Sequence, residues 1–279
     1  MAEQRYFRTY AREQYRGVGE IVDLGCLLGS TTIPLASGLA QSARVDRKHA
    51  RIHAYDLFEW YPWMSSLSFG RTYEPAESFL DEFKRRTARH ADLIKIYPGD
   101  VQTIGWHRAP IEFLLVDLSK SFELCDYIYR IFFPHLIVGE SLVLEQDYKH
   151  FYTPWLHLLH YRLRNHFALH ANIDGCSVVF RTVKRVDPAS MPMTDLKMAS
   201  EAELDEAYSY SLSLIGSGKG WQQANIVASR VMFYLHLGRV HEARAAFDRF
   251  VAEGYTLSSD LTVCQNHLRE LDEQAQVIC

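Results

Sequence analysis

The chain has 279 residues, which is long enough for one α/β domain of ordinary size and a smaller second unit. Hydrophobic residues make up 48% and charged residues 23%, a balance that excludes a disordered or fibrous chain. The formal net charge of -4 argues against broad binding to nucleic acid, which depends on clustered positive charge. This charge favours a small molecule or a neutral glycan as the partner.

The cysteines and the hydropathy pattern bear on the cellular compartment. The five cysteines are far apart, odd in number and without a C-x-x-C pair, so we expect reduced thiols and neither a disulfide framework nor a zinc site. The sequence has no run of about eighteen apolar residues, and its start, MAEQRYFRTYAREQYRG, is charged throughout. We therefore expect a cytoplasmic protein without a membrane span or a signal peptide.

Helical and strand patterns alternate through the first two thirds of the chain. The expected elements, in chain order, are a helix at 4–15, a strand at 20–24, a helix at 31–39, a strand at 51–55, a helix at 77–89, strands at 93–97 and 111–117, a helix at 122–133, a strand at 141–145, a helix at 155–167 and strands at 167–173 and 176–184. The run IEFLLVD is hydrophobic throughout, as in strands buried on both faces of a parallel sheet. This order predicts an α/β fold, with a Rossmann-like, seven-stranded, mostly parallel sheet and helices on both faces.

The composition changes near residue 187. The segment DPASMPMTD predicts a linker over 187–200, and helical spacing returns at 201–215. Residues 228–255 resemble one tetratricopeptide-type helix pair. One pair cannot form a solenoid, so we expect a helical cap on the main domain or on a second copy of the chain, which would give a homo-oligomer. The expected division is a main domain at 1–186, a linker at 187–200 and a helical region at 201–279.

Two glycines frame a tight turn after the first strand. In VDLGCLLGSTT, residues 22–32, Asp23 lies at the end of the strand, and Gly25 and Gly29 precede a helix whose first N–H groups can bind a ligand. An ordinary strand-to-helix turn can share this pattern. The glycine spacing differs from G-x-G-x-x-G, which argues against a dehydrogenase-type dinucleotide site.

Acidic residues follow the next two strands. Asp56 ends the second strand, where a carboxylate can accept hydrogen bonds from both hydroxyls of a ribose. Gly99-Asp100 follows the third strand, where an adenine edge would lie. Each position alone also fits a solvated strand end or a plain turn. Together with the glycine turn, they predict a nucleoside pocket, since ligands of such sheets bind at the carboxyl ends of the strands.

Four segments in order carry a family resemblance: VDLGCLLGSTT, HAYDLFEW, PGDVQTI and FLLVDLSKSFE, within about residues 15–185. They resemble class I S-adenosylmethionine-dependent methyltransferases, and within these the sugar O-methyltransferases of the macrocin O-methyltransferase (TylF-like) type. The resemblance implies S-adenosylmethionine as cofactor and a hydroxyl of a sugar, glycan or glycosylated small molecule as acceptor. It implies a cofactor pocket formed by Asp23, Gly25, Gly29, Ser30, Thr31, Asp56, Leu57, Asp100, Val101 and Asp117.

The same resemblance implies Mg²⁺, held by acidic residues at the ends of the fourth and fifth strands. The candidate metal ligands here are Asp117, Glu145, Gln146 and Asp147. Two positions depart from the TylF-like pattern. Ser119 stands where those enzymes carry a second aspartate, and Glu145-Gln146 stands where they carry paired aspartates. The usual general base is therefore missing from its place.

Candidate catalytic residues are Lys120, His150 and Asp117. Asp117-Leu118-Ser119-Lys120 resembles the aspartate-x-x-lysine arrangement of catechol-type O-methyltransferases, whose lysine is the base. Lys120 can take that role if burial lowers its pKa towards neutrality, and otherwise it is a surface lysine at a helix start. His150 follows the fifth strand and belongs to the residue type that titrates near neutral pH, although thirteen histidines are scattered through the chain.

An aromatic loop after Asp56 contains Phe58, Trp60, Tyr61, Trp63 and Phe69. It fits either a hydrophobic cover packed on the domain or a lid whose rings stack on the acceptor and exclude water. The leading hypothesis is thus an O-methyltransferase. The alternative is a methyltransferase-fold protein without efficient turnover that acts as an interaction module through its helical tail.

Overall fold

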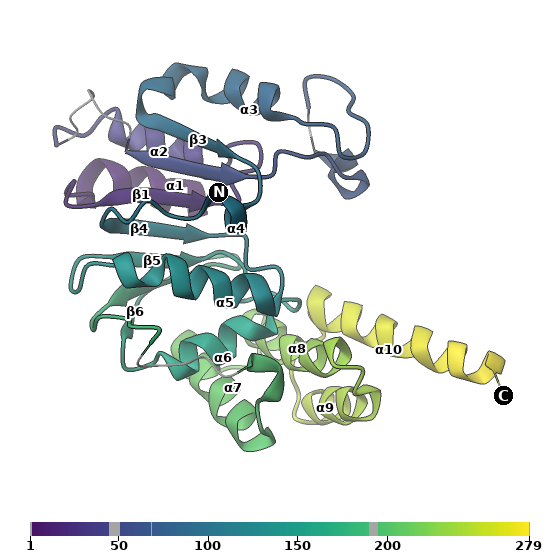
Figure 1. Cartoon of the computed structure of the whole chain (residues 1–279). Helices are drawn as coiled ribbons and strands as arrows, with labels where there is room; N and C mark the ends of the chain where they lie inside the picture. Colours follow the sequence, from purple (N-terminus) through teal and green to yellow (C-terminus); the bar gives the residue numbers. More distant parts are fainter. Residues whose placement is uncertain (1, 45–50, 68, 190–194, 279) are drawn as a thin grey trace.

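A seven-stranded sheet forms the centre of the structure, a computed structural model that describes residues 2–44, 51–67, 69–189 and 195–278. Its strands are β1 (Glu20–Leu24), β2 (Ile52–Asp56), β3 (Ile94–Pro98), β4 (Ile111–Val116), β5 (Leu142–Glu145), β6 (Phe167–Asn172) and β7 (Val178–Thr182). The order in the sheet is β3-β2-β1-β4-β5-β7-β6 (Figure 1). Strands β1 to β5 pair in parallel, and β7 runs antiparallel to both of its neighbours. The expected fold is confirmed.

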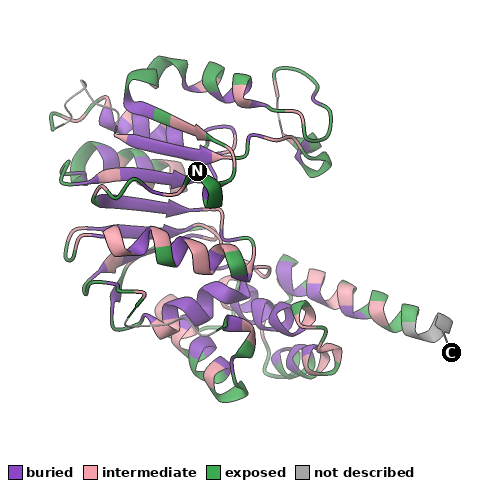
Figure 2. Ribbon diagram, in the orientation of Figure 1, coloured by how far each residue is buried: buried purple, intermediate pink, exposed green. Residues whose placement is uncertain are grey.

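Helices cover both faces of this sheet. They are α1 (Ala2–Thr9), α2 (Thr32–Leu39), α3 (Leu80–Thr87), α4 (Val101–Ile104), α5 (Phe122–Ile131) and α6 (Pro154–Arg162), joined by short turns of 3-10 or π-helix. Side chains of β4 alternate between two hydrophobic clusters: Phe113 and Leu115 pack with α1, α2 and α3, whereas Leu114 and Val116 pack with α5 and α6. All six residues of β4 are buried (Figure 2), which confirms the prediction that this hydrophobic segment is a strand buried on both faces of the sheet.

Four further helices follow the sheet: α7 (Glu201–Ile215), α8 (Trp221–His236), α9 (Val240–Ala252) and α10 (Ser259–Ile278). The expected pair at 228–255 corresponds to α8 and α9, while α10, which projects from the body, had no separate signal (Figure 1). Residues 190–194 of the expected linker and Cys279 lie outside the described residues. Every helix in the described ranges is too short or too polar to cross a membrane.

The four helices are attached to the segment that follows β5. Ser211 of α7 lies 2.9 Å from the hydroxyl of Tyr148. Asp260 of α10 accepts a hydrogen bond of 2.9 Å from the backbone N–H of Phe151. Residues of α6, α7 and α8 also share one hydrophobic cluster. The C-terminal helices therefore brace the loop at residues 146–153, which leaves the sheet at its carboxyl edge.

The order of the strands brings four strand ends together. Strands β1 and β4 are parallel neighbours although β2 and β3 separate them in sequence. The chain adds β2 and β3 on one side of β1 and the later strands on the other side, so the strand order switches between β1 and β4. Backbone hydrogen bonds continue past the strands, from Gly25 to Tyr55 (2.9 Å), from Asp117 to Leu24 (2.8 Å) and from Gln146 to Val116 (3.1 Å). The residues after β1, β2, β4 and β5 are thus fixed side by side, at the place where such sheets bind ligands.

A substitution at Gly38 can test how α1 packs on α2. A Cβ at Gly38 would collide with the carbonyl oxygen of Arg8 and lie 2.8 Å from the Cβ of Ala11. Helix propensity alone would make Gly38→Ala stabilising by about 1 kcal/mol. We expect Gly38→Ala to lower the free energy of unfolding by about 1–3 kcal/mol in urea denaturation, because the collision is with backbone and a packed helix. Gly218→Ala is the control, since its nearest neighbour would be 3.5 Å away; equal stability of both variants contradicts this packing.

Candidate active site

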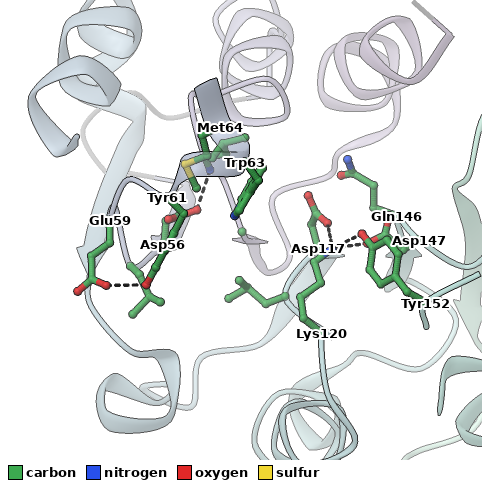
Figure 3. Close-up of a pocket in the computed structure, with 14 residues that line it drawn as sticks. Asp56, Glu59, Tyr61, Trp63, Met64, Asp117, Lys120, Gln146, Asp147 and Tyr152 are labelled. Carbon is green, nitrogen blue, oxygen red and sulfur yellow. Dashed lines mark hydrogen bonds and ion pairs between the residues drawn. The ribbon is translucent and has the colours of Figure 1, made fainter. Parts of the chain in front are cut away.

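A cavity of about 560 Å³ opens at the carboxyl ends of β1, β2, β4 and β5. Its lining comes from the strand ends, the aromatic loop and the loop after β5 (Figure 3). The lining residues are Gly25, Leu27, Asp56, Leu57, Glu59, Tyr61, Trp63, Met64, Asp117, Leu118, Lys120, Gln146, Asp147 and Tyr152. The cavity therefore combines segments from Gly25 to Tyr152, which are 127 positions apart in the sequence.

Asp23 lies behind the cavity and holds the first turn. Its carboxylate accepts hydrogen bonds from the hydroxyls of Thr31 (2.8 and 3.0 Å) and Thr32 (2.5 Å). Complete burial raises the pKa of Asp23 to about 6, although the two hydroxyls oppose the shift. Neither Asp23 nor Thr31 belongs to the described residues that line the cavity. Their side chains stabilise the turn instead of facing the space a ligand would fill.

Gly25 lines the cavity, but its closest constraint is the neighbouring strand. The residue has a φ of +92°, and a Cβ there would lie 3.0 Å from backbone atoms of Asp117. Glycine is therefore required at this position by the close approach of β1 and β4. Gly29, with a φ of +83°, and the exposed Ser30 lie further along the turn, outside the lining.

Asp56 faces the cavity from the end of β2. Its two oxygens accept backbone hydrogen bonds from Leu27 and Phe58, both of 2.8 Å. Burial raises the pKa of Asp56, and these two N–H groups oppose the rise. A carboxylate has about four acceptor positions, so both oxygens keep capacity for a ligand hydroxyl. The adjacent Leu57 lines the cavity as well.

The turn after β3 is hydrogen-bonded to the backbone of Asp56, but none of its described residues lines the cavity. Gly99 donates a backbone hydrogen bond of 2.9 Å to the carbonyl oxygen of Asp56. The exposed side chain of Asp100 caps α4 by accepting from Gln102 N at 2.9 Å, and Val101 is buried. The expectation that Asp100 and Val101 border the nucleoside stays a prediction.

Lys120 lies between two carboxylates on the other side of the cavity. Its Nζ is 2.6 Å from Oδ1 of Asp117, contacts Oδ2 of Asp147 and lies 3.3 Å from the hydroxyl of Tyr152 (Figure 3). Burial lowers the pKa of Lys120, but the two carboxylates more than offset this, and its pKa is raised above the ordinary value. The condition under which Lys120 could act as a base is therefore not met in this arrangement.

Asp117 has the opposite balance. Burial raises its pKa, the ammonium of Lys120 lowers it, and the carboxylate of Asp147 raises it again. The net shift is upward, which moves this carboxyl group towards the range in which it can exchange a proton near neutral pH. Asp117 is thus the acidic residue of the cavity that is best suited to accept a proton.

The four expected metal ligands do not form one set, because Asp117 and Asp147 meet at Lys120 whereas Glu145 turns away. Glu145 is buried, and its Oε1 accepts a hydrogen bond of 3.0 Å from His160 Nε2, away from the cavity. Asp117 and Asp147 are already paired with Lys120. Across the described ranges, no three His, Cys, Asp or Glu side chains gather as a metal site. This donor arrangement does not fit the oxygen cage that Mg²⁺ requires.

His150 is placed outside the cavity lining. Its Nδ1 lies 3.6 Å from Asp260 of α10, and its ring lies tilted against that of Tyr152, with 4.1 Å between centroids. Burial lowers the pKa of His150, and the carboxylate of Asp260 opposes this. His150 therefore supports Tyr152 and the contact with α10, and the expectation that it is the base gains no geometric support.

The aromatic loop divides into a buried half and an exposed half. Phe58 is fully buried and packs edge to face with Phe79 at 5.7 Å, and Phe69 packs against the same ring. Tyr61 and Trp63 line the cavity, and Trp63 remains 65% exposed. The expected packed cover is thus observed for Phe58 and Phe69, whereas the role of Tyr61 and Trp63 as a lid over the acceptor stays a prediction.

Sequence reasoning missed several lining residues, namely Leu27, Glu59, Met64, Leu118 and Tyr152. Tyr152 follows β5 by seven positions and reaches the site because the loop folds back onto Lys120. Glu59 lies in the aromatic loop and accepts a hydrogen bond of 2.7 Å from Tyr61. Tyr152 was the one with a usable signal, as it lies in the polar segment beside the two named candidates Asp147 and His150.

No protein-family model matches this sequence, and no curated protein matches it. Among solved structures, it is similar to the apo structure of CalS11, a TDP-rhamnose 3'-O-methyltransferase and an enzyme in calicheamicin biosynthesis. The TM-score is 0.43 and the sequence identity 13%, over 64% of this chain and 76% of that chain. A second structure of CalS11, described as a calicheamicin methyltransferase, gives the same values.

The pKa of Asp23 predicts a pH-dependent contribution to stability. Because its folded-state value of about 6 lies above the ordinary 3.8, ionised Asp23 costs stability above about pH 6, and protonation relieves the cost. We expect the free energy of unfolding of the wild type, relative to Asp23→Asn, to rise by about 2 kcal/mol from pH 8 to pH 4. Urea denaturation at a series of pH values measures this; a difference that stays constant or falls with decreasing pH contradicts the burial of a strained carboxyl group.

Proposed function

We propose that the protein is an S-adenosylmethionine-dependent methyltransferase that transfers a methyl group to a hydroxyl of a sugar or glycan. The observation that carries the proposal is the single cavity in which the glycine turn after β1, Asp56 after β2 and Asp117 after β4 meet. Its volume of about 560 Å³ lies in the range of small-molecule sites, which is about 300–1,000 Å³.

The charge of the lining supports a cationic cofactor. Four acidic residues, Asp56, Glu59, Asp117 and Asp147, face one lysine in this lining. S-adenosylmethionine carries a positive sulfonium, which a partly enclosed, acidic cavity attracts more strongly than it does a neutral molecule. The rings of Tyr61 and Trp63 add faces on which a cation or a nucleobase can stack.

One side of the cavity is suited to the cofactor and the other side to the hydroxyl that accepts the methyl group. We assign the ribose to Asp56, whose oxygens retain acceptor capacity, and the reacting hydroxyl to the group of Asp117, Lys120 and Tyr152. Asp100 and Val101 are proposed to approach the adenine, because their turn is bonded to Asp56. Gly29, Ser30 and Thr31 are proposed to support the turn next to the cofactor.

The chemistry is an in-line displacement at the methyl carbon. The hydroxyl oxygen forms a bond to this carbon while the carbon–sulfur bond breaks, and its electron pair remains on the sulfur of S-adenosylhomocysteine. The hydroxyl proton passes to the carboxylate of Asp117, which burial makes more basic than an ordinary aspartate. Trp63 and Tyr61 exclude water from the reacting atoms when the loop is in place.

A second cavity offers room for the remainder of the acceptor. It has a volume of about 550 Å³ and shares Gln146 and Asp147 with the first. Its other walls include Glu3 near the N-terminus and Trp221 at the start of α8. We propose that residues 1–186 carry catalysis and that the helical region at 201–279, after the linker at 187–200, contributes through Trp221 to acceptor binding. Self-association through these helices stays a prediction.

Cofactor binding is tested with Asp56→Asn, which removes the charge and keeps the shape. We expect the affinity for S-adenosylmethionine and S-adenosylhomocysteine to fall at least about tenfold in calorimetry, since hydrogen bonds to a charged group contribute about 1.5–3 kcal/mol. Glu74→Gln, an exposed residue of the same loop outside the lining, is the matched control. If the wild type binds neither compound, the proposed function is wrong; binding without turnover on any acceptor supports the interaction-module alternative.

The proton acceptor is tested with Asp117→Asn. We expect kcat to fall about 100-fold or more, because a general base contributes about 10²–10⁴ in rate, while the affinity for S-adenosylmethionine changes by less than about tenfold. Release of S-adenosylhomocysteine in the presence of a panel of sugars and glycosides is the assay. A full rate in Asp117→Asn, together with a loss in His150→Ala, would assign the base to the histidine instead.

A further inference from the structure

We propose that the ammonium of Lys120 takes the place of a divalent cation at this site, so that methyl transfer by this protein proceeds without a metal. The inference rests on the proposed function for its reaction, but its geometric part stands on the lining alone. Asp117 and Asp147 follow two adjacent parallel strands, an arrangement that brings two carboxylates to one point. The cation found at that point is a side chain of the chain itself.

The hydrogen bonds around Lys120 leave no vacant donor. An ammonium carries three N–H groups, and three oxygen atoms surround Nζ: Oδ1 of Asp117, Oδ2 of Asp147 and the hydroxyl of Tyr152. The Tyr152 hydroxyl in turn donates to Oδ2 of Asp147 at 3.0 Å. Each member of the group is thus bonded to at least one other, and Lys120 is fixed although its side chain is 41% exposed.

The oxygens that a metal would need are engaged elsewhere. Mg²⁺ takes about six oxygen ligands and holds them in a near-ideal octahedron. Here one oxygen of Asp117 and one of Asp147 are bonded to Lys120, and Glu145 is turned into the core towards His160. Gln146 Oε1 is buried without a hydrogen-bond partner and is the remaining neutral oxygen beside the site. A divalent ion could reach this set once Lys120 had left it.

A fixed ammonium can perform the electrostatic part of a metal's work. Placed beside the reacting hydroxyl, its positive charge stabilises the negative charge that develops on the oxygen as the proton leaves. It also holds the carboxylate of Asp117 in position to receive that proton. A chelator cannot remove this cation, in contrast to a bound metal.

The test compares Mn²⁺ binding by the wild type, Lys120→Met and Lys120→Arg, followed by electron paramagnetic resonance on the full chain. We expect Lys120→Met to bind Mn²⁺ at least about tenfold more tightly than the wild type, because two carboxylates lose their cation. Lys120→Arg, which keeps the charge, should behave as the wild type. The gain should disappear in Lys120→Met/Asp147→Asn, and thermal unfolding of each variant confirms that it is folded.

Three results overturn the proposal. The first is Mn²⁺ or Mg²⁺ binding by the wild type that Asp147→Asn abolishes. The second is wild-type turnover that EDTA removes and Mg²⁺ restores. The third is a folded Lys120→Met variant with no gain in Mn²⁺ affinity. Failure of the proposed function appears separately, as absence of S-adenosylmethionine binding in calorimetry, and leaves the Mn²⁺ comparison valid for the cation position.

Discussion

The close approach of β1 and β4 is the constraint on which the rest of the site depends. Asp117 donates its backbone N–H to Leu24, and Gly25 lies so near the Asp117 backbone that no side chain fits between them. This contact places the end of β4 beside the glycine turn and, through Tyr55, beside the end of β2. The groups that we propose to bind the cofactor and the acceptor can then face one cavity, because the strand ends are fixed to one another by backbone hydrogen bonds.

The loop after β5 completes this frame. Its Asp147 and Tyr152 complete the group around Lys120, and the C-terminal helices hold the loop from behind. Asn225 of α8 donates a hydrogen bond to the carbonyl oxygen of Lys149, which lies between Asp147 and Tyr152. The helical region is thus bonded to this loop directly. Under the proposed function, these helices would serve catalysis by supporting the loop that carries Asp147 and Tyr152.

Much of this fold could be predicted from the sequence, since buried strands such as IEFLLVD and the alternation with helices depend on local periodicity. The positions of Gly25, Asp56 and Asp117 in one cavity followed from the rule that ligands bind at strand ends. Side-chain partners could not be predicted in this way. Periodicity does not indicate that Thr31 and Thr32 would enclose Asp23, that Glu145 would turn to His160, or that two carboxylates would raise the pKa of Lys120. Each of these contacts depends on how turns and loops fold back onto the strand ends.

The most direct measurement of the central claim is a crystal structure of the protein grown with S-adenosylhomocysteine. The account predicts the ribose hydroxyls within hydrogen-bond distance of the carboxylate at the end of β2, with the sulfur directed towards the lysine that joins β4 to the loop after β5. The ligand in another part of the molecule, or turned so that its sulfur faces away from that lysine, would contradict the account.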